Sequence, residues 1–341
     1  MTAATVASRG RRPGRGRQRG RWRRARRLVP LLSATLIAGY VTVTYPTFRS
    51  AMSKARAELA AGSQVVSTRA GPIEYAEAGH GPPILVVHGA GGGYDQGLLL
   101  AQSFIGSGYR LIVPSRFGFL RTPLPADGSA VAEADAYAAL LDALGIDQVA
   151  VAAISNGGPS GLQFAIRHPQ RTTGLIMFAA KSHSAPPERL AQTVVFNAAF
   201  RSDYLYWLVT TRFESAMLDL LGMPADVQAA LTAEQAEIAR RFLEAMHPIS
   251  LRTAGIFNER REITVLDPDV FRLERITAPT LVIHGRRDTL QPFTHGQHTA
   301  DNIPGARLIA LEHGGHMPVN HLAQIRDEIA AFLDASAPPA T

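Results

Sequence analysis

The chain has 341 residues, 46% of them hydrophobic, which suffices for one α/β domain with an insertion and a tail. It contains no cysteine, which excludes disulfides, thiolate nucleophiles and cysteine-based metal sites. The net charge is +7, but residues 1–27 hold 11 arginines and no acidic residue, so the excess belongs to the tail and does not indicate a basic binding surface on the folded domain.

An apolar run without charged residues, Leu28 to Tyr45, follows the Arg-rich tail 1–27. Basic residues ahead of an apolar run are typical of a signal sequence or a signal anchor. Its 18 residues approach the roughly 20 that a membrane span needs. We predict a transmembrane signal anchor at 28–46, a cytoplasmic tail and a catalytic domain outside the cytoplasm.

Two alternatives remain open for this N-terminal region. One is export after signal cleavage, for which the best cleavage site, Ser53-Lys54-Ala55, lies rather far downstream and contains a lysine. The other is a disordered tail that binds nucleic acid through its phosphates. The apolar run argues against the second alternative, so we expect no nucleic-acid partner.

Beyond a connector at 47–63, short apolar runs alternate with helical segments, which predicts a mostly parallel sheet with helices on both faces. Runs such as Ile84 to Val87 are apolar throughout, as in strands that are covered on both faces. Apolar residues at helical spacing predict helices at 131–145 and 320–334. The predicted strands are 64–69, 72–77, 83–88, 109–114, 147–153, 173–179, 279–284 and 306–311.

Residues 182–277 break this alternation, because they show helical stretches and no convincing strand. We predict a helical insertion there, which divides the core into residues 64–181 and 278–335. The first half of the insertion is aromatic and either packs against the core or forms a lid over an apolar substrate pocket. In the second interpretation Gly91, Tyr204, Tyr206 and Trp207 line that pocket.

Ser155 ends an apolar strand and is followed by two glycines and a helical stretch. A serine on a tight strand-to-helix turn is typical of a nucleophile elbow with the pattern G-x-S-x-G. The residues two before and two after it, Ala153 and Gly157, must be small, because we expect them to approach each other closely. Alanine at the first position departs from the pattern but is the next smallest residue. A serine that only caps a helix would look similar.

A glycine-rich stretch, His88 to Gly93, follows the strand at 83–88. It lacks the G-K-[ST] ending of a phosphate loop. We therefore predict that the backbone N–H of Ala90, or that of Gly91, joins the N–H of Asn156 as an oxyanion hole. His88 is expected to support the loop.

Asp288 and His316 each follow a predicted C-terminal strand, and the order Ser155, Asp288, His316 is that of a catalytic triad on a parallel sheet. His313 competes with His316 for the role of base, and the Gly-His-x-Pro context favours His316. Arg116 also follows a strand, where it either faces the pocket or forms a structural salt bridge.

The motifs HGAGGG at 88–93, AISNGG at 153–158, HGRRD at 284–288 and EHGGHMP at 312–318 occur in this order. In these motifs and their order, residues 64–335 resemble the branch of the α/β-hydrolase superfamily that has a serine nucleophile. The resemblance implies an eight-stranded, mostly parallel sheet with helices on both faces and a helical lid. It also implies that Ser155 attacks a carbonyl, that His316 takes the proton and that Asp288 orients the imidazole.

The predicted activity is therefore that of a serine hydrolase that cleaves an ester-like carbonyl substrate with an apolar acyl or ring group. The alternatives are a cofactor-free haloperoxidase-like or carbon–carbon bond hydrolase on the same triad, and a non-catalytic binding module. We expect no metal and no cofactor, because the remaining histidines are not spaced for a metal site with carboxylates. The pattern does not indicate an oligomeric state.

Overall fold

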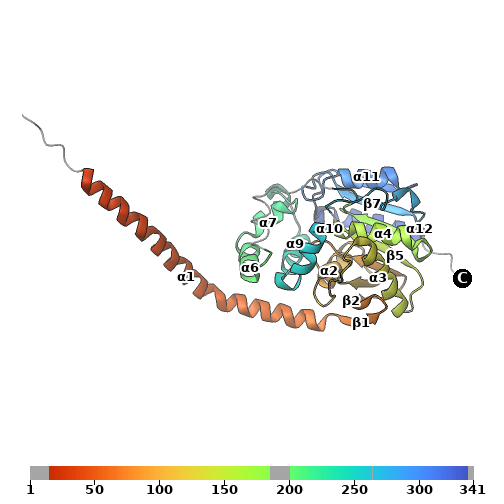
Figure 1. Ribbon diagram of the computed structural model, residues 1–341. Helices are drawn as coiled ribbons and strands as arrows, with labels where there is room; N and C mark the ends of the chain where they lie inside the picture. The colour runs from red at the N-terminus through yellow and green to blue at the C-terminus, as the bar shows by residue number, and fades with distance from the viewer. Residues whose placement is uncertain (1–14, 185–199, 263, 337–341) are drawn as a thin grey trace, which may run out of the picture. The chain divides into compact units, whose positions relative to one another are not determined.

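The computed structural model describes residues 15–184, 200–262 and 264–336, with side chains described from residue 33 onward. The chain divides into two compact units, residues 1–53 and 54–341. The first helix, α1 (Arg15–Ala61), begins in the Arg-rich tail and contains both the apolar run and most of the predicted connector (Figure 1).

The predicted membrane anchor at 28–46 is wrong. Over the part of the chain that the structure describes, none of the helices combines the length and the apolar character needed to cross a bilayer. The apolar run only approaches the length of a span, and the hydroxyl groups of Ser33, Thr35, Thr42 and Thr44 interrupt it. The predicted location, with the catalytic domain held outside the cytoplasm by this anchor, is corrected with it.

Eight strands form one sheet in the order β1-β2-β4-β3-β5-β6-β7-β8. The β1/β2 and β2/β4 pairs are antiparallel, and every later pair is parallel, which confirms the predicted mostly parallel sheet. Each predicted strand is present to within two residues: β1 (Gln64–Thr68), β2 (Gly71–Ala78), β3 (Pro83–Val87), β4 (Arg110–Pro114), β5 (Val149–Ile154), β6 (Thr172–Phe178), β7 (Thr280–Gly285) and β8 (Arg307–Leu311).

The sheet is covered on both faces, and the side chains of β5 show this directly. Ala150 and Ala152 pack into one apolar cluster, and Val149 and Val151 pack into another on the opposite face. Because successive side chains of a strand point to opposite faces, an apolar run without alternation is stable only when both faces are buried. This is why the central strands lack the polar–apolar pattern of a half-exposed strand.

Helices provide the cover on each face (Figure 1). The first apolar cluster includes α2 (Tyr94–Phe104) and α12 (Leu322–Ser336), and the second includes α3 (Ala130–Ala143) and α4 (Gly158–Arg167). The predicted helices at 131–145 and 320–334 correspond to α3 and α12. The remaining core elements are α11 (Thr294–Asn302) and the 3-10 turns η1 (Ser155–Gly157), η2 (Pro169–Arg171), η4 (Leu273–Arg275) and η5 (Val319–His321).

Between β6 and β7, in the segment called the insertion, the described residues form helices and no strand. Thr232 caps α9 through a reciprocal capping box with Gln235, which satisfies two amides at the helix start. The elements of this segment are α6 (Asp203–Arg212), α7 (Glu214–Leu220), α8 (Ala225–Ala229), α9 (Ala233–Glu244), η3 (Ile249–Leu251) and α10 (Thr253–Glu262).

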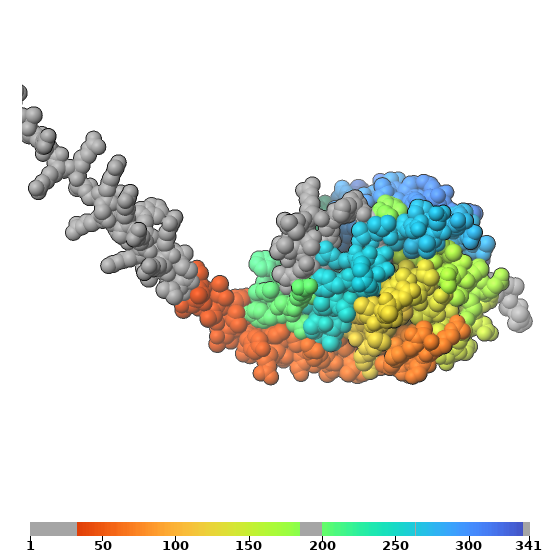
Figure 2. Space-filling model, viewed as in Figure 1, coloured from red at the N-terminus to blue at the C-terminus, as the bar shows by residue number. Residues whose placement is uncertain are grey.

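The insertion packs on the core through a small apolar cluster. Tyr206, Met246, Ile249 and Ile256 from the insertion bury their side chains together with Phe119 from the loop after β4. In Figure 2 the surface of α9 and α10 (cyan) continues without a break into that of the core. The insertion therefore shares buried apolar surface with the loops at the carboxyl ends of the strands.

Candidate active site

Ser155 stands at the turn from β5 into α4, and its backbone is in the left-handed region, with φ at +51°. A side chain other than glycine rarely adopts this conformation, which costs on the order of 1–3 kcal/mol. The surrounding structure holds the turn, because the carbonyl oxygen of Ser155 accepts a hydrogen bond of 3.0 Å from the backbone N–H of Lys181. The sharp turn presents the hydroxyl group at the carboxyl edge of the sheet, as a nucleophile elbow does.

The small residues around this turn are needed for two separate contacts. A Cβ on Gly157 would lie 2.5 Å from the carbonyl oxygen of Val87 and 2.7 Å from that of His88. Ala153 instead faces Gly161 of α4, where an added Cβ would lie 2.4 Å from the Cβ of Ala153. Gly157 is therefore crowded by the end of β3, and the glycine at 161 makes room for alanine in the elbow.

Ser155, His316 and Asp288 lie in hydrogen-bonding contact. Nε2 of His316 is 3.0 Å from Oγ of Ser155, and Nδ1 of His316 is 2.8 Å from Oδ2 of Asp288. An ionised carboxylate only accepts hydrogen bonds, so Nδ1 of His316 carries the proton and Nε2 is free to accept the hydroxyl proton of Ser155. All three side chains are at least nine-tenths buried. His313, the competing histidine, is exposed.

The loop after β7 holds Asp288 in its ionised form. Oδ1 accepts hydrogen bonds from the backbone N–H groups of Leu290 at 2.9 Å and Gln291 at 2.8 Å. Burial alone raises the pKa of Asp288, but His316, His284 and the Gln291 amide outweigh it, so the pKa lies well below its usual value. Asp288 can therefore orient the imidazole and stabilise its cationic form.

His88 fixes the glycine-rich loop after β3 through hydrogen bonds. The ring accepts the backbone N–H of Arg116 at Nε2 (2.9 Å), so Nδ1 carries the proton and donates to the carbonyl oxygen of Gly89 (2.8 Å). Burial lowers the pKa of His88 well below its usual value, which keeps the ring neutral. His88 thus supports the loop, as expected, and leaves the Ala90 amide as a candidate oxyanion donor.

Arg252 of the insertion also fixes the glycine-rich loop. Its guanidinium donates to the carbonyl oxygen of Gly92 at 2.6 Å and to both carboxylate oxygens of Asp95, at 3.1 and 2.8 Å. The Arg252 side chain is fully buried. A planar guanidinium can make these contacts at once, so it sets the position of the loop relative to the insertion.

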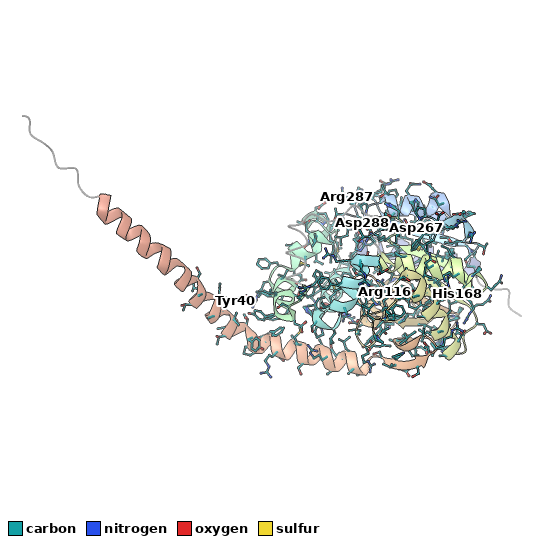
Figure 3. The ribbon with its side chains drawn as sticks, viewed as in Figure 1. Tyr40, Arg116, His168, Asp267, Arg287 and Asp288 are labelled. Atoms are coloured by element: carbon teal, nitrogen blue, oxygen red, sulfur yellow. The ribbon has the colours of Figure 1, made fainter. Side chains whose placement is uncertain are left out.

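A second set of buried polar contacts reaches Asn156, the other candidate oxyanion donor. Its side chain donates to Oε1 of Glu259 at 3.2 Å and accepts from Nε2 of Gln291 at 2.8 Å. Arg116 donates to Oε2 of Glu259 at 2.9 Å and to Glu133 at 3.1 Å. Figure 3 labels Arg116, which belongs to this network, and Asp288, whose Oδ1 accepts the backbone N–H of Gln291.

This network decides between the two interpretations of Arg116, which makes buried ion pairs. Burial disfavours the Arg116 cation, but Glu133 and Glu259 outweigh it and raise its pKa above the usual value. Burial raises the pKa of Glu259, although Arg116 and Asn156 oppose it. Sequence reasoning missed Glu259, because nothing in its helical context distinguishes it from a surface glutamate.

Residues of the insertion also contact the loops that carry the triad. A Cβ on Gly91 would lie 2.1 Å from Cε of Met246, and a Cβ on Gly222 would lie 2.7 Å from the backbone nitrogen of His316. The candidate oxyanion loop and the base loop are thus each in contact with a different part of the insertion.

Three of the four predicted pocket residues lie on α6, and the fourth, Gly91, lies in the glycine-rich loop after β3. Tyr206 and Trp207 are buried, and the Tyr206 hydroxyl group donates to the sulfur of Met246 at 2.9 Å. Tyr204 is half-buried, with its ring 6.0 Å from that of Trp207. Tyr206 is thus linked to the glycine-rich loop through Met246, and the role of all four residues in a pocket stays a prediction.

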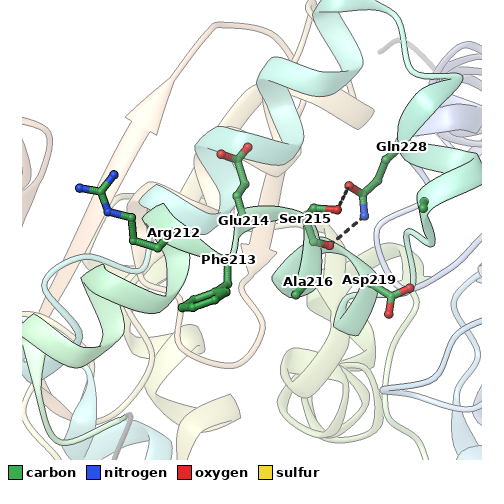
Figure 4. A pocket seen from close by; sticks show the side chains of 8 residues that line it. Arg212, Phe213, Glu214, Ser215, Ala216, Asp219 and Gln228 are labelled. Carbon is green, nitrogen blue, oxygen red and sulfur yellow. Dashed lines mark hydrogen bonds between the residues drawn. The ribbon is translucent and has the colours of Figure 1, made fainter. Parts of the chain in front are cut away.

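Two cavities lie away from the triad. One, of about 520 Å³, lies on the insertion between α6 and α8, where Ser215 and Gln228 bond to each other (Figure 4). The other, of about 330 Å³, is lined by His183, Glu274 and His298, among others. Neither contains a serine with a histidine base. Within the described ranges, no three His, Asp or Glu side chains are grouped for a metal ion.

Comparison with known proteins extends over most of the chain. A family model described as the alpha/beta hydrolase fold matches residues 82–319. The 2-hydroxymuconate semialdehyde hydrolase of Pseudomonas putida is 30% identical over 264 residues, which cover 75% of this chain and 89% of that protein. The 2-hydroxy-6-oxo-6-phenylhexa-2,4-dienoate hydrolase of Comamonas testosteroni is 28% identical over 253 residues, which cover 72% and 84%.

Among solved structures, an alpha/beta hydrolase fold protein from Nakamurella multipartita is similar, with a TM-score of 0.66 and 31% sequence identity. The similarity covers 81% of this chain and all of that one. The family match includes the strands from β3 to β8 and the loops that carry Ser155, Asp288 and His316. The chain therefore belongs to the α/β-hydrolase family and is an enzyme of the hydrolase type.

Proposed function

We propose that the protein is a serine hydrolase that cleaves an ester or a related carbonyl substrate through an acyl-enzyme. The observation that carries this proposal is the continuous contact from Ser155 Oγ through His316 to Asp288. In it, the acid is fixed by backbone amides and the base has its unprotonated nitrogen toward the hydroxyl group. A serine hydroxyl group is a weak nucleophile unless such a base accepts its proton.

In the proposed mechanism Ser155 Oγ attacks the substrate carbonyl while His316 Nε2 takes the hydroxyl proton. Asp288 stabilises the resulting imidazolium, and the backbone N–H groups of Ala90 and Asn156 bind the oxyanion. The tetrahedral intermediate collapses, and His316 gives its proton to the leaving group. Water, deprotonated by His316, then attacks the acyl-enzyme, releases the acid and regenerates Ser155.

The insertion acts in this proposal as a lid that selects the substrate. The support is that Met246 contacts the glycine-rich loop at Gly91, that Gly222 lies against His316, and that Arg252 and Glu259 bond to groups beside the site. Met246 and the aromatic residues behind it are apolar, so the part of the acyl or ring group that meets them is apolar as well.

A second candidate is hydrolysis of a carbon–carbon bond beside an aldehyde or ketone carbonyl group, on the same triad. It is favoured by the 30% identity to a 2-hydroxymuconate semialdehyde hydrolase. That substrate is coloured and carries no ester, so loss of its absorbance together with identification of the products separates the two activities. The protein should be offered this compound and a panel of 4-nitrophenyl esters in parallel.

A fluorophosphonate probe tests the serine mechanism directly, because it phosphonylates a serine only where a base activates the hydroxyl group. We expect labelling of Ser155, its loss in Ser155→Ala, and its retention in Ser160→Ala. Ser160 is a suitable control because it is also buried beside the elbow but bonds to Glu133 instead of a histidine. A folded protein without any label would refute the serine mechanism and favour a non-catalytic binding module.

A further inference from the structure

The whole chain contains two lysines, Lys54 and Lys181, although 35 of its residues are lysine or arginine. They lie in opposite environments. The side chain of Lys54 is 77% exposed, whereas Lys181 is only 5% exposed. The other basic residues counted here are all arginines. Lys181, which follows β6, is therefore unusual in this chain because it places an ammonium group in a buried position.

Lys181 lies directly beside the nucleophile elbow. The backbone N–H of Lys181 donates to the carbonyl oxygen of Ser155. A Cβ on Gly158 would lie 2.2 Å from the carbonyl oxygen of Lys181. The chain turns sharply just before it, because Ala179 has a φ of +44°. The side chain therefore starts at the same edge of the sheet as the triad.

The ammonium group of Lys181 has no hydrogen bond and no ion pair with any residue in the described part of the chain. Glu259 opposes the fall of its pKa through its charge, and Lys181 in turn lowers the pKa of His295. Glu259 makes its contacts elsewhere, with Asn156 through Oε1 and with Arg116 through Oε2. Burial lowers the pKa of Lys181, the expected response of a cation that lacks a partner.

We propose that Lys181 binds a carboxylate group of the substrate, so that the enzyme acts on carbonyl compounds that also carry a carboxylate. The inference rests on the proposed serine hydrolysis, because it places this carboxylate beside the serine that reacts. Its support is the position of the Lys181 backbone beside the elbow, the burial of its side chain and the lack of a partner among the described residues. A bound carboxylate would supply the counter-charge that these residues do not.

A carboxylate fits this group better than a phosphate does. A single ammonium group is a point charge, whereas phosphate sites in proteins usually combine an arginine fork or several backbone amides. The two buried arginines near the site, Arg116 and Arg252, already bond to Glu133, Glu259 and Asp95. Among the side chains that the structure describes beside the elbow, Lys181 is the monovalent cation that lacks a partner, and it matches one monovalent anion.

The kinetic test compares two esters with five-carbon acyl groups. The acyl end of 4-nitrophenyl hydrogen glutarate is a carboxylate, and that of 4-nitrophenyl pentanoate is a methyl group. Lys181→Met removes the charge at similar length, and Lys181→Arg keeps the charge. We expect the ratio of kcat/KM for the anionic ester to that for the neutral ester to fall at least tenfold in Lys181→Met, and to stay within a few-fold of wild type in Lys181→Arg.

Two outcomes of the kinetic test would overturn the assignment. One is an unchanged ratio in Lys181→Met. The other is an equal fall for both esters together with a lower melting temperature, because this would show that Lys181 only balances the charge of Glu259. If wild type cleaves neither ester, or if Ser155→Ala still cleaves them, the proposed hydrolysis fails instead.

A binding test does not depend on turnover. Protein grown with lysine labelled with ¹³C at Cε gives two lysine signals, which Lys54→Arg assigns. Glutarate should shift the Lys181 signal with saturation and leave the Lys54 signal in place, whereas neutral glutaramide should shift neither. A Lys181 signal that glutarate does not move, or that moves in parallel with Lys54, contradicts carboxylate binding even if the esters are cleaved.

Discussion

The loops at the carboxyl ends of the strands and the helical insertion after β6 hold their polar groups by different means. Asp288 is fixed by amides of its own loop, and His316 by Asp288, so these contacts join residues at the ends of neighbouring strands. The insertion reaches the same site through two long side chains, Arg252 and Glu259, which bond to loops far away in the sequence.

The difference separates two tasks. In the proposed mechanism the loops of the sheet place the groups that exchange protons, and the sheet itself determines their spacing. The insertion does not supply a triad residue but fixes the loops that carry the candidate oxyanion donors. Changes in the loops should therefore affect the rate of the chemical step. Changes in the insertion should affect how accurately the candidate oxyanion donors are placed, and which substrate is preferred.

The largest effect is expected in the loop after β8. His316→Ala removes the base and should lower kcat by about 10⁴-fold or more, with little change in the melting temperature. His313→Ala should stay within a few-fold of wild type, since His313 is exposed and makes no contact with Ser155. The measurement is steady-state ester hydrolysis, and the reverse order of the two variants would assign the base to His313.

The next effect tests whether the insertion positions Asn156. Glu133→Gln and Glu259→Gln each remove one carboxylate from Arg116, and each should cost about 3–5 kcal/mol of stability, because a buried cation loses a partner. Only Glu259 also bonds to Asn156. We therefore expect kcat to fall about tenfold further in Glu259→Gln than in Glu133→Gln, measured below both melting temperatures. Equal kcat values would limit Glu259 to a structural role.

A smaller effect is expected from Met246, which covers the glycine-rich loop at Gly91. Met246→Ala should open this space and shift the preference toward longer acyl chains by roughly tenfold in relative kcat/KM. Phe213→Ala is the matched control, because Phe213 is an insertion residue that is 61% exposed. If 4-nitrophenyl esters of two to ten carbons keep their wild-type order in Met246→Ala, the insertion does not select the acyl group at this point.

The smallest effect compares one buried imidazole in each region. Burial lowers the pKa of His295, on α11 of the core, to about 3, and that of His247, in the insertion, to about 4. Below a pH of about 6.5 the unfolded chain takes up a proton at each histidine and the folded protein does not. The free energy of unfolding should therefore decrease as the pH is lowered, by at most about 1.4 kcal/mol per pH unit for each group.

The charged and titratable neighbours of His295 are His183, Lys181, His284 and Asp288, and those of His247 are Arg252 and Asp203. Replacing either histidine by glutamine should reduce the slope of stability against pH between 6.5 and 4, as measured by urea unfolding. A slope that is unchanged in His247→Gln but reduced in His295→Gln would mean that the insertion unfolds separately from the core.

Much of the fold could be predicted because it depends on local patterns. All eight strands follow from short apolar runs, and the capping box of α9 follows from Thr232 and Gln235. The contact of Ser155, Asp288 and His316 could also be anticipated, since each residue follows a strand and parallel strands bring their carboxyl ends to one edge. The prediction of a membrane anchor failed, because basic residues ahead of an apolar run do not suffice for a span when that run only approaches the length of one.

The amino-acid sequence by itself thus determined the type of sheet, the positions of its strands and the three residues at its reactive edge. Only the tertiary structure decided which side chains surround them. Glu259 bonds to Asn156 across 103 positions, and Gly161 makes room for Ala153. Periodicity and turn chemistry report on neighbours within a few residues, whereas a buried ion pair or a close approach depends on how distant elements pack. The unpartnered state of Lys181 belongs to this second class, because only packing shows which charges are absent around it.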